Sequence, residues 1–408
     1  MKTVIPVNVE LITTGTELLL GFVTNTHVNF IARRLAPLGL RLQRHVTVGD
    51  DPSVMRAAIA DALTRADILL ITGGLGPTSD DITRDIVAEL LDRPLRLDDG
   101  VADAIRERFR KRHREMPEKN LVQAMVPEGA TVLPNPNGTA PGLYIEHQGK
   151  QIFLLPGPPR ELCPMFEHSV LPLFPRGAPA HCLLFKVAGL PESVVEEKVA
   201  PALADLADLE LGYCARPGEV EVRVLSHLPA QIAKAETRLR AVLGDNLFAV
   251  ADERMEEIVV RQLAAARKTV ATAESCTGGL IAHRLTNVSG SSAVFLAGYV
   301  TYSNAAKTRD LGVREETLQQ FGAVSEPTAR EMAEGARARA GTDYALSATG
   351  IAGPTGGTAE KPVGLVFIGL ATPTGTQVQR WQLAFDRETF KFFVSQTALD
   401  MLRRELLK

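Results

Sequence analysis

Apolar and polar residues alternate in blocks along the first part of the chain. Apolar runs at 7–15, 41–50 and 66–76 read as strands, whereas residues 26–39 and 53–66 place their apolar side chains at helical spacing. Strands that alternate with helices are typical of a parallel β-sheet covered by helices. The pattern therefore predicts an N-terminal α/β domain.

The pattern changes after the proline-rich stretch LPLFPRGAPAH at 171–181, which we expect to mark a domain boundary. A strand at 181–190, a helix at 191–206, a hairpin at 209–227 that turns at Pro217 and Gly218, a helix at 229–244 and a strand at 247–252 follow. This βαββαβ order predicts a small ferredoxin-like or KH-like α+β unit.

A second α/β alternation begins with a helix at 253–268 and continues to a C-terminal helix at 387–406. The chain has 408 residues, which is too long for one ordinary domain. We predict three domains, at 1–172, 176–251 and 253–408.

Composition narrows the classes of partner and compartment. The formal net charge is −3 and 45% of residues are hydrophobic, so the chain can bury real cores and shows no basic surplus for nucleic acid. The four cysteines lack CxxC or Cys/His spacing, which predicts reduced thiols and no zinc site. No signal peptide pattern or apolar run of membrane length is present, and we expect a cytoplasmic protein.

The sequence ITGGLGPTSDDIT, residues 71–83, carries the chemistry of the first domain. A strand that leads into a glycine-rich loop and then a helix can wrap a phosphate with backbone N–H groups. Asp80 and Asp81 supply hard oxygen ligands for Mg²⁺ beside that phosphate. The alternative is a tight strand-to-helix turn in which an aspartate only caps the helix.

Three further glycine- or proline-rich turns lie beside strands: TTGTELLLG at 13–21, LPNPNGTAPG at 133–142 and LPGPPRE at 155–161. Together with the glycine-rich loop they resemble, in order and over about residues 1–170, the MogA/MoaB-like molybdopterin-binding domain of the competence/damage-inducible CinA family. The resemblance implies an ADP-ribose pyrophosphatase that uses a divalent metal, Mg²⁺ with Mn²⁺, Co²⁺ or Ni²⁺ as alternatives, and K⁺ as an optional second ion. It places phosphate at Gly73, Gly74, Gly76 and Thr78, and the rest of the pocket at Asn137 and Gly138. The metal ligands would be Glu17, Asp80 and Asp81, with Asp81 also a catalytic candidate, and the resemblance leaves open which aspartate orients the attacking water.

The middle domain carries little chemistry. Between its first strand and helix the sequence reads AGLPES, which lacks the GxxG clamp that KH domains use on RNA. We therefore expect a connector or dimerisation module and no nucleic-acid partner.

The sequence AESCTGG, residues 273–279, stands where an apolar run gives way to a helical pattern. The first turn of that helix can supply N–H groups to an oxyanion, so either Ser275 or Cys276 could attack a carbonyl. A cysteine nucleophile usually needs a histidine, but His283 lies on the helix body and no histidine follows it. Tyr302 and Lys307 of GYVTYSNAAK favour the serine, because a desolvated lysine can act as its base. The alternative for Lys307 is an ordinary charge on a helix surface.

AESCTGG, AGYVTYSNAAK, FGAVSE at 321–326 and SATGIAGPTGGTAEKPVGLVF at 347–367 resemble the nicotinamide mononucleotide deamidase domain of the same family, over about 253–408. The resemblance implies that Ser275 is the nucleophile, Lys307 its base and Tyr302 the proton relay or orienting group, with no cofactor. It also implies that the phosphate or oxyanion region is formed by Thr349, Gly350, Gly353 and Gly356.

The joint prediction is a pyridine-nucleotide salvage hydrolase with two sites, for ADP-ribose and for nicotinamide mononucleotide. A homodimer is implied by the resemblance, and no membrane partner is expected. One alternative is a binding or regulatory protein linked to DNA uptake or repair. Another, molybdopterin transfer, rests on the N-terminal resemblance alone and leaves the deamidase motifs unexplained.

Overall fold

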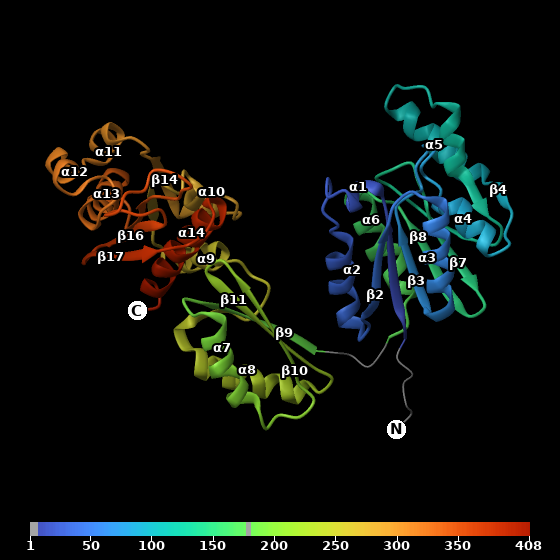
Figure 1. Ribbon diagram of the computed structural model, residues 1–408, viewed down its shortest axis with the longest axis horizontal. Coiled ribbons are helices and arrows are strands. Elements are labelled where there is room, and N and C mark those ends of the chain that lie inside the picture. Colours follow the sequence, from blue (N-terminus) through green and yellow to red (C-terminus); the bar gives the residue numbers. More distant parts are fainter. Residues whose placement is uncertain (1–6, 177–180) are drawn as a thin grey trace. The chain divides into compact units, whose positions relative to one another are not determined.

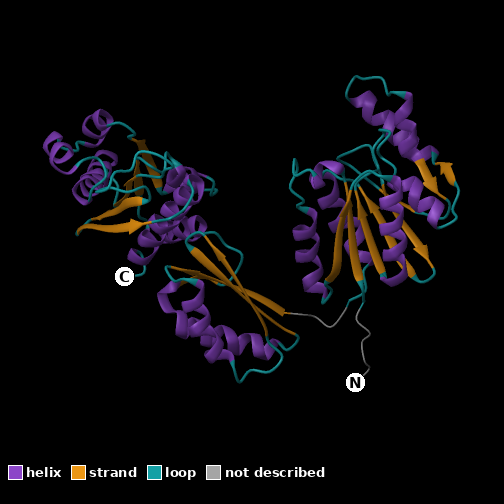
Figure 2. Cartoon of the chain, viewed as in Figure 1, coloured by secondary structure: helices purple, strands orange, loops and turns teal. Residues whose placement is uncertain are grey.

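The computed structural model describes residues 7–176 and 181–408, which form two compact units, one ending at His181 and the other beginning at Cys182. Both units combine sheets with helices (Figure 2). Residues 177–180 of the expected boundary stretch lie outside the described residues. No helix within 7–176 and 181–408 has the length and apolar character that a bilayer span requires.

The first unit is built on a six-stranded sheet of order β2-β1-β3-β8-β7-β6 (Figure 1). Its strands are β1 (Val9–Thr14), β2 (Leu42–Val48), β3 (Ile68–Thr72), β6 (Thr131–Leu133), β7 (Gly142–His147) and β8 (Lys150–Leu155).

Both faces of the central strands are apolar, because helices cover the sheet on each side. In β3, Ile68 and Leu70 pack in one core and Leu69 and Ile71 in the other, as the two-residue period of a strand requires. The first core is closed by α2 (His27–Leu35) and α6 (Pro159–Met165), and the second by α3 (Pro52–Arg65) and α4 (Thr83–Leu90). The unit also holds α1 (Thr16–Leu19), α5 (Asp99–Lys111) and a two-stranded sheet of β4 (Leu95–Leu97) and β5 (Met125–Pro127).

The expected α/β class is confirmed, but the sheet is mixed and not wholly parallel. β1, β2, β3 and β8 run parallel, whereas β7 pairs antiparallel with both β8 and β6. The cause is the two-residue turn at Gln148 and Gly149, since so short a connection can join only antiparallel strands.

The middle segment has the predicted βαββαβ order in a four-stranded sheet, β10-β11-β9-β12. The hairpin turns at Pro217 and Gly218, where Arg216 pairs with Glu219. The helices pack their apolar faces on one side of this sheet. The elements are β9 (His181–Ala188), α7 (Glu192–Leu203), β10 (Glu210–Arg216), β11 (Glu219–Ser226), α8 (Pro229–Leu243) and β12 (Leu247–Ala249).

The C-terminal segment shares the second unit and contains a five-stranded sheet of order β14-β13-β15-β16-β17. β13 pairs parallel with β14 and β15, and β16 and β17 extend the sheet antiparallel. Its strands are β13 (Val270–Glu274), β14 (Phe295–Val300), β15 (Tyr344–Gly350), β16 (Leu365–Thr372) and β17 (Gly375–Gln382).

Helices cover both faces of this sheet. One core contains side chains of α9 (Met255–Ala266), α10 (Leu280–Thr286) and α14 (Arg387–Glu405), and the other those of α11 (Asn304–Leu311) and α13 (Glu326–Ala340). The short α12 (Glu315–Phe321) lies against α13. The sheet thereby fixes the ends of its strands, where the predicted catalytic residues lie.

Candidate active sites

Three of the predicted C-terminal motifs follow three adjacent parallel strands. Glu274, the last residue of β13, pairs with Val300 of β14 and with Ala348 of β15. The carboxyl ends of parallel strands meet at one edge of a sheet, which is where α/β proteins place their ligand sites. The motifs are far apart in sequence, and this topology brings them to one edge.

Ser275 and Lys307 are in direct contact at this edge. The Lys307 Nζ donates to the Ser275 Oγ at 3.2 Å and to the carbonyl oxygen of Thr301 at 2.8 Å. Ser275 is partly exposed, and its own N–H is held by the carbonyl of Ala348 at 2.9 Å. The predicted nucleophile therefore has an accessible hydroxyl and a backbone N–H that is held by a hydrogen bond.

Lys307 is not an ordinary charge on a helix surface, because its residue is only 1% exposed. Burial disfavours the ammonium form and lowers the pKa of Lys307 below its usual value. Within residues 7–176 and 181–408, the two hydrogen-bond partners of this Nζ are neutral oxygens and neither is a carboxylate. A lysine in these surroundings can lose its proton to act as a general base.

Cys276 is unsuited to nucleophilic attack. Its thiol is buried, and the loss of solvation raises the pKa of Cys276 to about 12. The thiolate is the reactive form, so a thiol with this pKa is inert near neutral pH. The geometry thus favours Ser275 over Cys276.

The contacts of Glu274 contradict the expectation that the first-turn N–H groups of α10 are free to bind an oxyanion. Its carboxylate, with the residue fully buried, accepts the N–H groups of Gly279, Ile281 and Ala282 at 3.0, 3.0 and 2.8 Å. These first-turn groups, which we expected to be free for an oxyanion, are therefore already bonded. Glu274 acts as a charged cap that fastens α10 to the end of β13.

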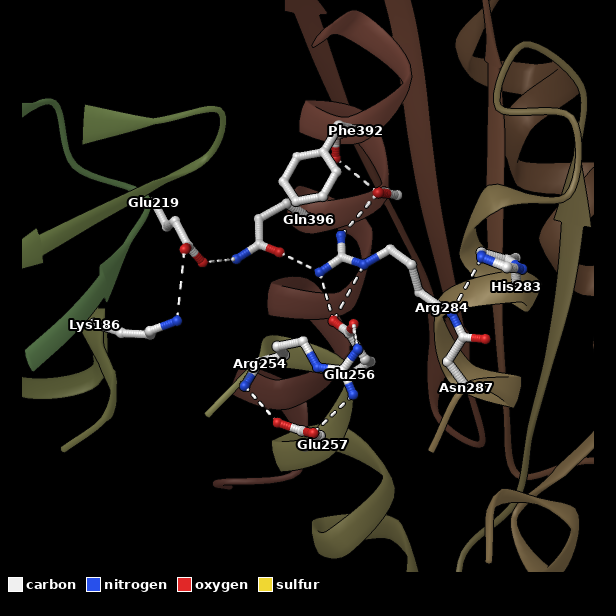
Figure 3. A network of polar contacts seen from close by, with 11 residues as sticks. Lys186, Glu219, Arg254, Glu256, Glu257, His283, Arg284, Asn287, Phe392 and Gln396 are labelled. Carbon is white, nitrogen blue, oxygen red and sulfur yellow. Dashed lines mark hydrogen bonds and ion pairs between the residues drawn. The ribbon is translucent and has the colours of Figure 1, made fainter. Parts of the chain in front are cut away.

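A second set of contacts holds the body of α10 (Figure 3). The buried guanidinium of Arg284 donates to Glu256 of α9 at 2.7 Å and to Ser395 of α14 at 2.8 Å, and it also bonds Gln396. The side-chain amide of Gln396 in turn donates a hydrogen bond to Glu219 of the middle domain at 2.9 Å. The helix that follows the nucleophile is thus anchored at its start and along its body.

Tyr302 is placed differently from the Ser275–Lys307 pair. Its side chain is exposed, and its hydroxyl accepts a hydrogen bond from Arg387 at 2.8 Å. Arg387 also donates to the carbonyl of Gly353 at 2.9 Å, so it joins two of the predicted motifs. Sequence reasoning missed Arg387, although a basic residue in the first turn of the last helix was its one visible signal.

The predicted residues of the glycine-rich stretch at 347–367 lie at the same end of β15. Thr349 is buried and its hydroxyl donates to the carbonyl of Ala323, in the FGAVSE motif, at 2.7 Å. A side chain at Gly350 would approach the carbonyl of Leu365 to 2.7 Å. Gly353 and Gly356 adopt left-handed conformations, with φ of 75° and 92°, in the loop beyond the strand. The hydrogen bond of Thr349 therefore fixes the end of β15 to the FGAVSE motif, whereas Gly356 is exposed to solvent.

The N-terminal unit brings its four motifs to one edge of its sheet in the same way. The motifs at 13–21, 71–83 and 155–161 follow β1, β3 and β8, which are adjacent and parallel, and the motif at 133–142 follows β6. A cavity of about 530 Å³ opens there, and its lining includes six of the predicted residues: Glu17, Gly73, Gly74, Gly76, Asp80 and Asp81. Missed members of the lining include Asn25, His27, Asp50 and Glu161.

The glycines of this loop are required by close contacts. Gly73 and Gly74 have φ of 104° and 65°, and a Cβ at Gly74 would lie 2.1 Å from the hydroxyl of Thr83. A Cβ at Gly76 would lie 2.3 Å from a carboxylate oxygen of Asp81. The backbone is therefore exposed to the cavity without intervening side chains.

The two aspartates differ in their contacts. Asp81 accepts the N–H of Thr78 at 2.9 Å and also the Thr78 hydroxyl, so it holds the loop closed. Hydrogen bonding from Thr78 lowers the pKa of the exposed Asp80 below its usual value. Asp80 is thus a carboxylate near neutral pH, while Asp81 closes the loop before α4. Neither aspartate caps this helix, because its N-cap residue is Ile82 and no side chain of the described residues bonds its first N–H groups.

The acidic residues do not form a complete metal cage. Among the described residues, 7–176 and 181–408, no three His, Cys, Asp or Glu side chains are close enough to hold a metal ion. Mg²⁺ is commonly bound by one or two carboxylates together with substrate phosphates and waters. Glu17, Asp80 and Asp81 line the same cavity, so one or two of these carboxylates could hold a metal ion in this way.

Asn137 and Gly138 lie beside this cavity. The Asn137 amide donates to the carbonyl of Arg160 at 2.9 Å, and Gly138 lines a neighbouring cavity of about 860 Å³. The Gly138 N–H is held by Asn135 at 2.8 Å, and the Asn135 amide also bonds the buried Glu161 at 2.8 Å. Asn137 therefore supports the loop and lines neither cavity, whereas Asn135 lines the neighbouring cavity and Glu161 the first one.

Comparison with known proteins shows the same three segments. The chain matches the "Probable molybdopterin binding domain" over residues 10–176, the "Damage-inducible protein CinA KH domain" over 184–249 and the "CinA C-terminal domain" over 252–406. It is 46% identical to a CinA-like protein of Akkermansia muciniphila, covering 96% of each chain, and 44% identical to a CinA-like protein of Kosmotoga olearia, covering 98% of each. The crystal structure of the competence/damage inducible protein CihA from Agrobacterium tumefaciens is 44% identical and covers 38% of this chain and 98% of its own, with a TM-score of 0.36.

Proposed function

The chain belongs to the CinA family of competence/damage-inducible proteins, and we propose that its C-terminal domain hydrolyses nicotinamide mononucleotide to nicotinate mononucleotide and ammonia. The observation that carries this proposal is the contact between the half-buried Ser275 Oγ and the buried Lys307 Nζ at 3.2 Å. A serine hydroxyl beside a lysine of lowered pKa is one arrangement by which a general base can activate a serine for amide hydrolysis.

In the proposed reaction, neutral Lys307 takes the proton of Ser275 as the Oγ attacks the carboxamide carbon. The C–N bond of the resulting tetrahedral intermediate breaks, and Lys307 returns the proton to the leaving nitrogen, which departs as ammonia. Water then hydrolyses the acyl-serine ester, with Lys307 again accepting a proton and returning it to Ser275. The net consumption is one water molecule for each amide.

In this proposal, Arg387 and the loop that contains Gly353 bind the substrate's phosphate. The Arg387 guanidinium donates to the Gly353 carbonyl and to the Tyr302 hydroxyl. These two hydrogen bonds hold its positive charge in one position at the site. Tyr302, bonded to that cation, is proposed to orient the substrate or relay a proton. A mononucleotide would then present its amide to Ser275.

The test is the rate of ammonia release by the purified full chain with nicotinamide mononucleotide. Ser275→Ala should lose roughly 10³-fold or more, because little catalysis remains once the nucleophile is removed from a group that acts as a unit. Ser289→Ala, at an exposed serine beyond α10, is the matched control and should keep the native rate. Equal rates in both variants would overturn the assignment.

For the N-terminal domain we propose hydrolysis of ADP-ribose to AMP and ribose 5-phosphate. The supporting observation is the single cavity that the glycine-rich loop shares with Glu17, Asp80 and Asp81. The backbone of Gly73, Gly74 and Gly76 would bind the pyrophosphate, and the acids would hold a divalent metal ion. Such an ion, when bound, would stabilise the negative charge that develops on the phosphate oxygens.

A panel of pyridine nucleotides, incubated with the full chain and analysed by mass, tests both activities together. AMP with ribose 5-phosphate reports the first site, and nicotinate mononucleotide reports the second. Because both substrates derive from NAD, their joint cleavage would support a role in pyridine-nucleotide salvage. If neither product forms, a binding or regulatory role linked to DNA uptake or repair is favoured.

A further inference from the structure

A cavity in the Cys182–Lys408 unit lies between the middle and C-terminal segments, and Ser275 is not part of its lining. Its volume is about 790 Å³, within the range of small-molecule sites. One wall is the turn of the β10–β11 hairpin with the start of α7, and the other is α14 with β17 and Phe385. Both walls belong to the same compact unit.

Aromatic side chains dominate the C-terminal wall. Trp381 and Phe393 meet edge to face at 5.4 Å between centroids, and Phe385 is tilted against Phe393 at 5.6 Å. Neither pair is stacked face to face, since the ring planes meet at 72° and 48°. Phe385 is 41% exposed, which places an aromatic ring at the mouth of the cavity.

Charges around the cavity are unbalanced toward the acidic side. Both guanidinium groups of the lining are paired, Arg404 with Asp400 at 2.7 Å and Arg216 with Glu221 at 3.2 Å. The lining also contains Glu192, in the first turn of α7, and Glu219. Lys186 lies 3.9 Å from Glu219 and Arg403 lies 2.6 Å from Asp400, so these charges are balanced in pairs. Among the described residues, Glu192 is the lining charge that has no ion-pair partner.

The hairpin wall is rigidly held against α14. A side chain at Gly218 would lie 2.8 Å from the Cγ of Gln396, so the turn fits closely on that helix. The Gln396 amide donates to Glu219 at 2.9 Å, and Lys186 lies 3.9 Å from the same carboxylate (Figure 3). The cavity is therefore a fixed feature of the fold, with its acidic wall already in place.

From this geometry we infer that the cavity is a binding site for a small ligand with a flat, positively charged aromatic group. Aromatic faces attract a cation through their quadrupole, and the carboxylates complement its charge. An anionic ligand of the same shape would meet the unpaired carboxylate of Glu192, whereas both guanidinium groups of the lining are already paired. This site is separate from the residues proposed for amide hydrolysis.

The chain offers a specific probe, because Trp381 is its single tryptophan. Tryptophan emission of the full chain is followed while benzamidinium, benzamide or benzoate is added, three probes of one shape with positive, zero and negative charge. We expect a saturable change with benzamidinium, at a half-saturating concentration at least tenfold lower than for benzoate, and with benzamide between them. No saturable change, or equal half-saturation by all three, would overturn the inference.

Two variants localise the response. Phe385→Ala, at an exposed ring, should abolish the saturable change, whereas Phe321→Ala, at a 43% exposed ring on α12, should leave it as in the native chain. Glu192→Gln keeps the shape of the side chain and should reduce the preference for benzamidinium over benzoate severalfold. A native response in Phe385→Ala, or an unchanged preference in Glu192→Gln, would contradict the site. Ser275→Ala should respond like the native chain, so the result is independent of the proposed amidase.

Discussion

Replacing Lys307 by arginine should remove nearly all amide hydrolysis while keeping a positive side chain at the same position. Arginine stays protonated at every accessible pH, so it cannot accept the Ser275 proton. Its guanidinium can still donate to the carbonyl of Thr301, which Lys307 bonds at 2.8 Å in the native chain. The measurement is the rate of ammonia release from nicotinamide mononucleotide at saturating substrate.

The size of the loss follows from the role of the lysine. A positioned general base contributes about 10²–10⁴ in rate, or roughly 3–5 kcal/mol of barrier. An ordinary lysine is only about 0.1% neutral near pH 7.5, and every tenfold gain in the neutral fraction corresponds to about 1.4 kcal/mol. Burial of Lys307 supplies such a gain, because desolvation penalises the ammonium form.

The pH dependence gives the sign of the effect. The pKa of Lys307 is lowered from 10.5, and the neutral amine is the active form. The native rate should therefore rise with pH and level off once pH exceeds the lowered pKa, at a point below 10.5. Lys307→Arg should show no such rise, since its side chain does not titrate in this range.

Lys268→Arg is the matched control, because Lys268 is a partly exposed lysine that pairs with Asp343 at 2.8 Å on the surface. It should retain the native rate and pH profile. A Lys307→Arg rate within tenfold of native, together with an unchanged rise with pH, would refute the role of Lys307 as base.

Three other changes test the remaining assignments. Glu274→Gln should lower the free energy of unfolding by about 1–3 kcal/mol in urea, because at least one of its three bonds to α10 is lost; an unaltered value would contradict its capping role. Cys276→Ser should keep ammonia release within severalfold of native, and inactivation would transfer the nucleophile to the thiol. A chelator should stop ADP-ribose cleavage and spare ammonia release, and Asp80→Ala should reproduce the first effect alone; equal loss of both activities would argue against separate sites.

The pairing of Ser275 with Lys307 could be anticipated only as two candidates 32 residues apart. Strand periodicity placed both near strand ends, and the parallel order of β13 and β14 then brings those ends together. The sequence alone could not decide whether Lys307 is buried. That depends on the packing of α11 against the sheet, which involves residues from distant segments.

The hydrogen-bond partners of individual side chains were harder to predict. Glu274 precedes AESCTGG's serine directly, but nothing in the pattern distinguishes a helix-capping carboxylate from a catalytic one. Arg387 approaches Tyr302 and Gly353 from the last helix, more than 80 residues beyond the tyrosine. Such contacts require the three-dimensional arrangement of strands that only the folded chain provides.

In the N-terminal unit, the strand-end motifs and the glycine-rich loop were readable because each has a local conformational cause. The orientation of β7 was not expected from the α/β alternation, since the decisive feature is a two-residue turn. The contact of Asp81 with Thr78 likewise depends on how the loop closes, which the spacing of the two residues permits but does not require.

The burial of Cys276 has a consequence for oxidative stress. Peroxides and alkylating agents attack cysteine through its thiolate, and a pKa of about 12 leaves fewer than roughly one thiol in ten thousand ionised near pH 7.5. The neighbouring hydroxyl of Ser275 has no comparable oxidation chemistry. The C-terminal domain should therefore continue to turn over under peroxide concentrations that silence hydrolases built on a reactive cysteine.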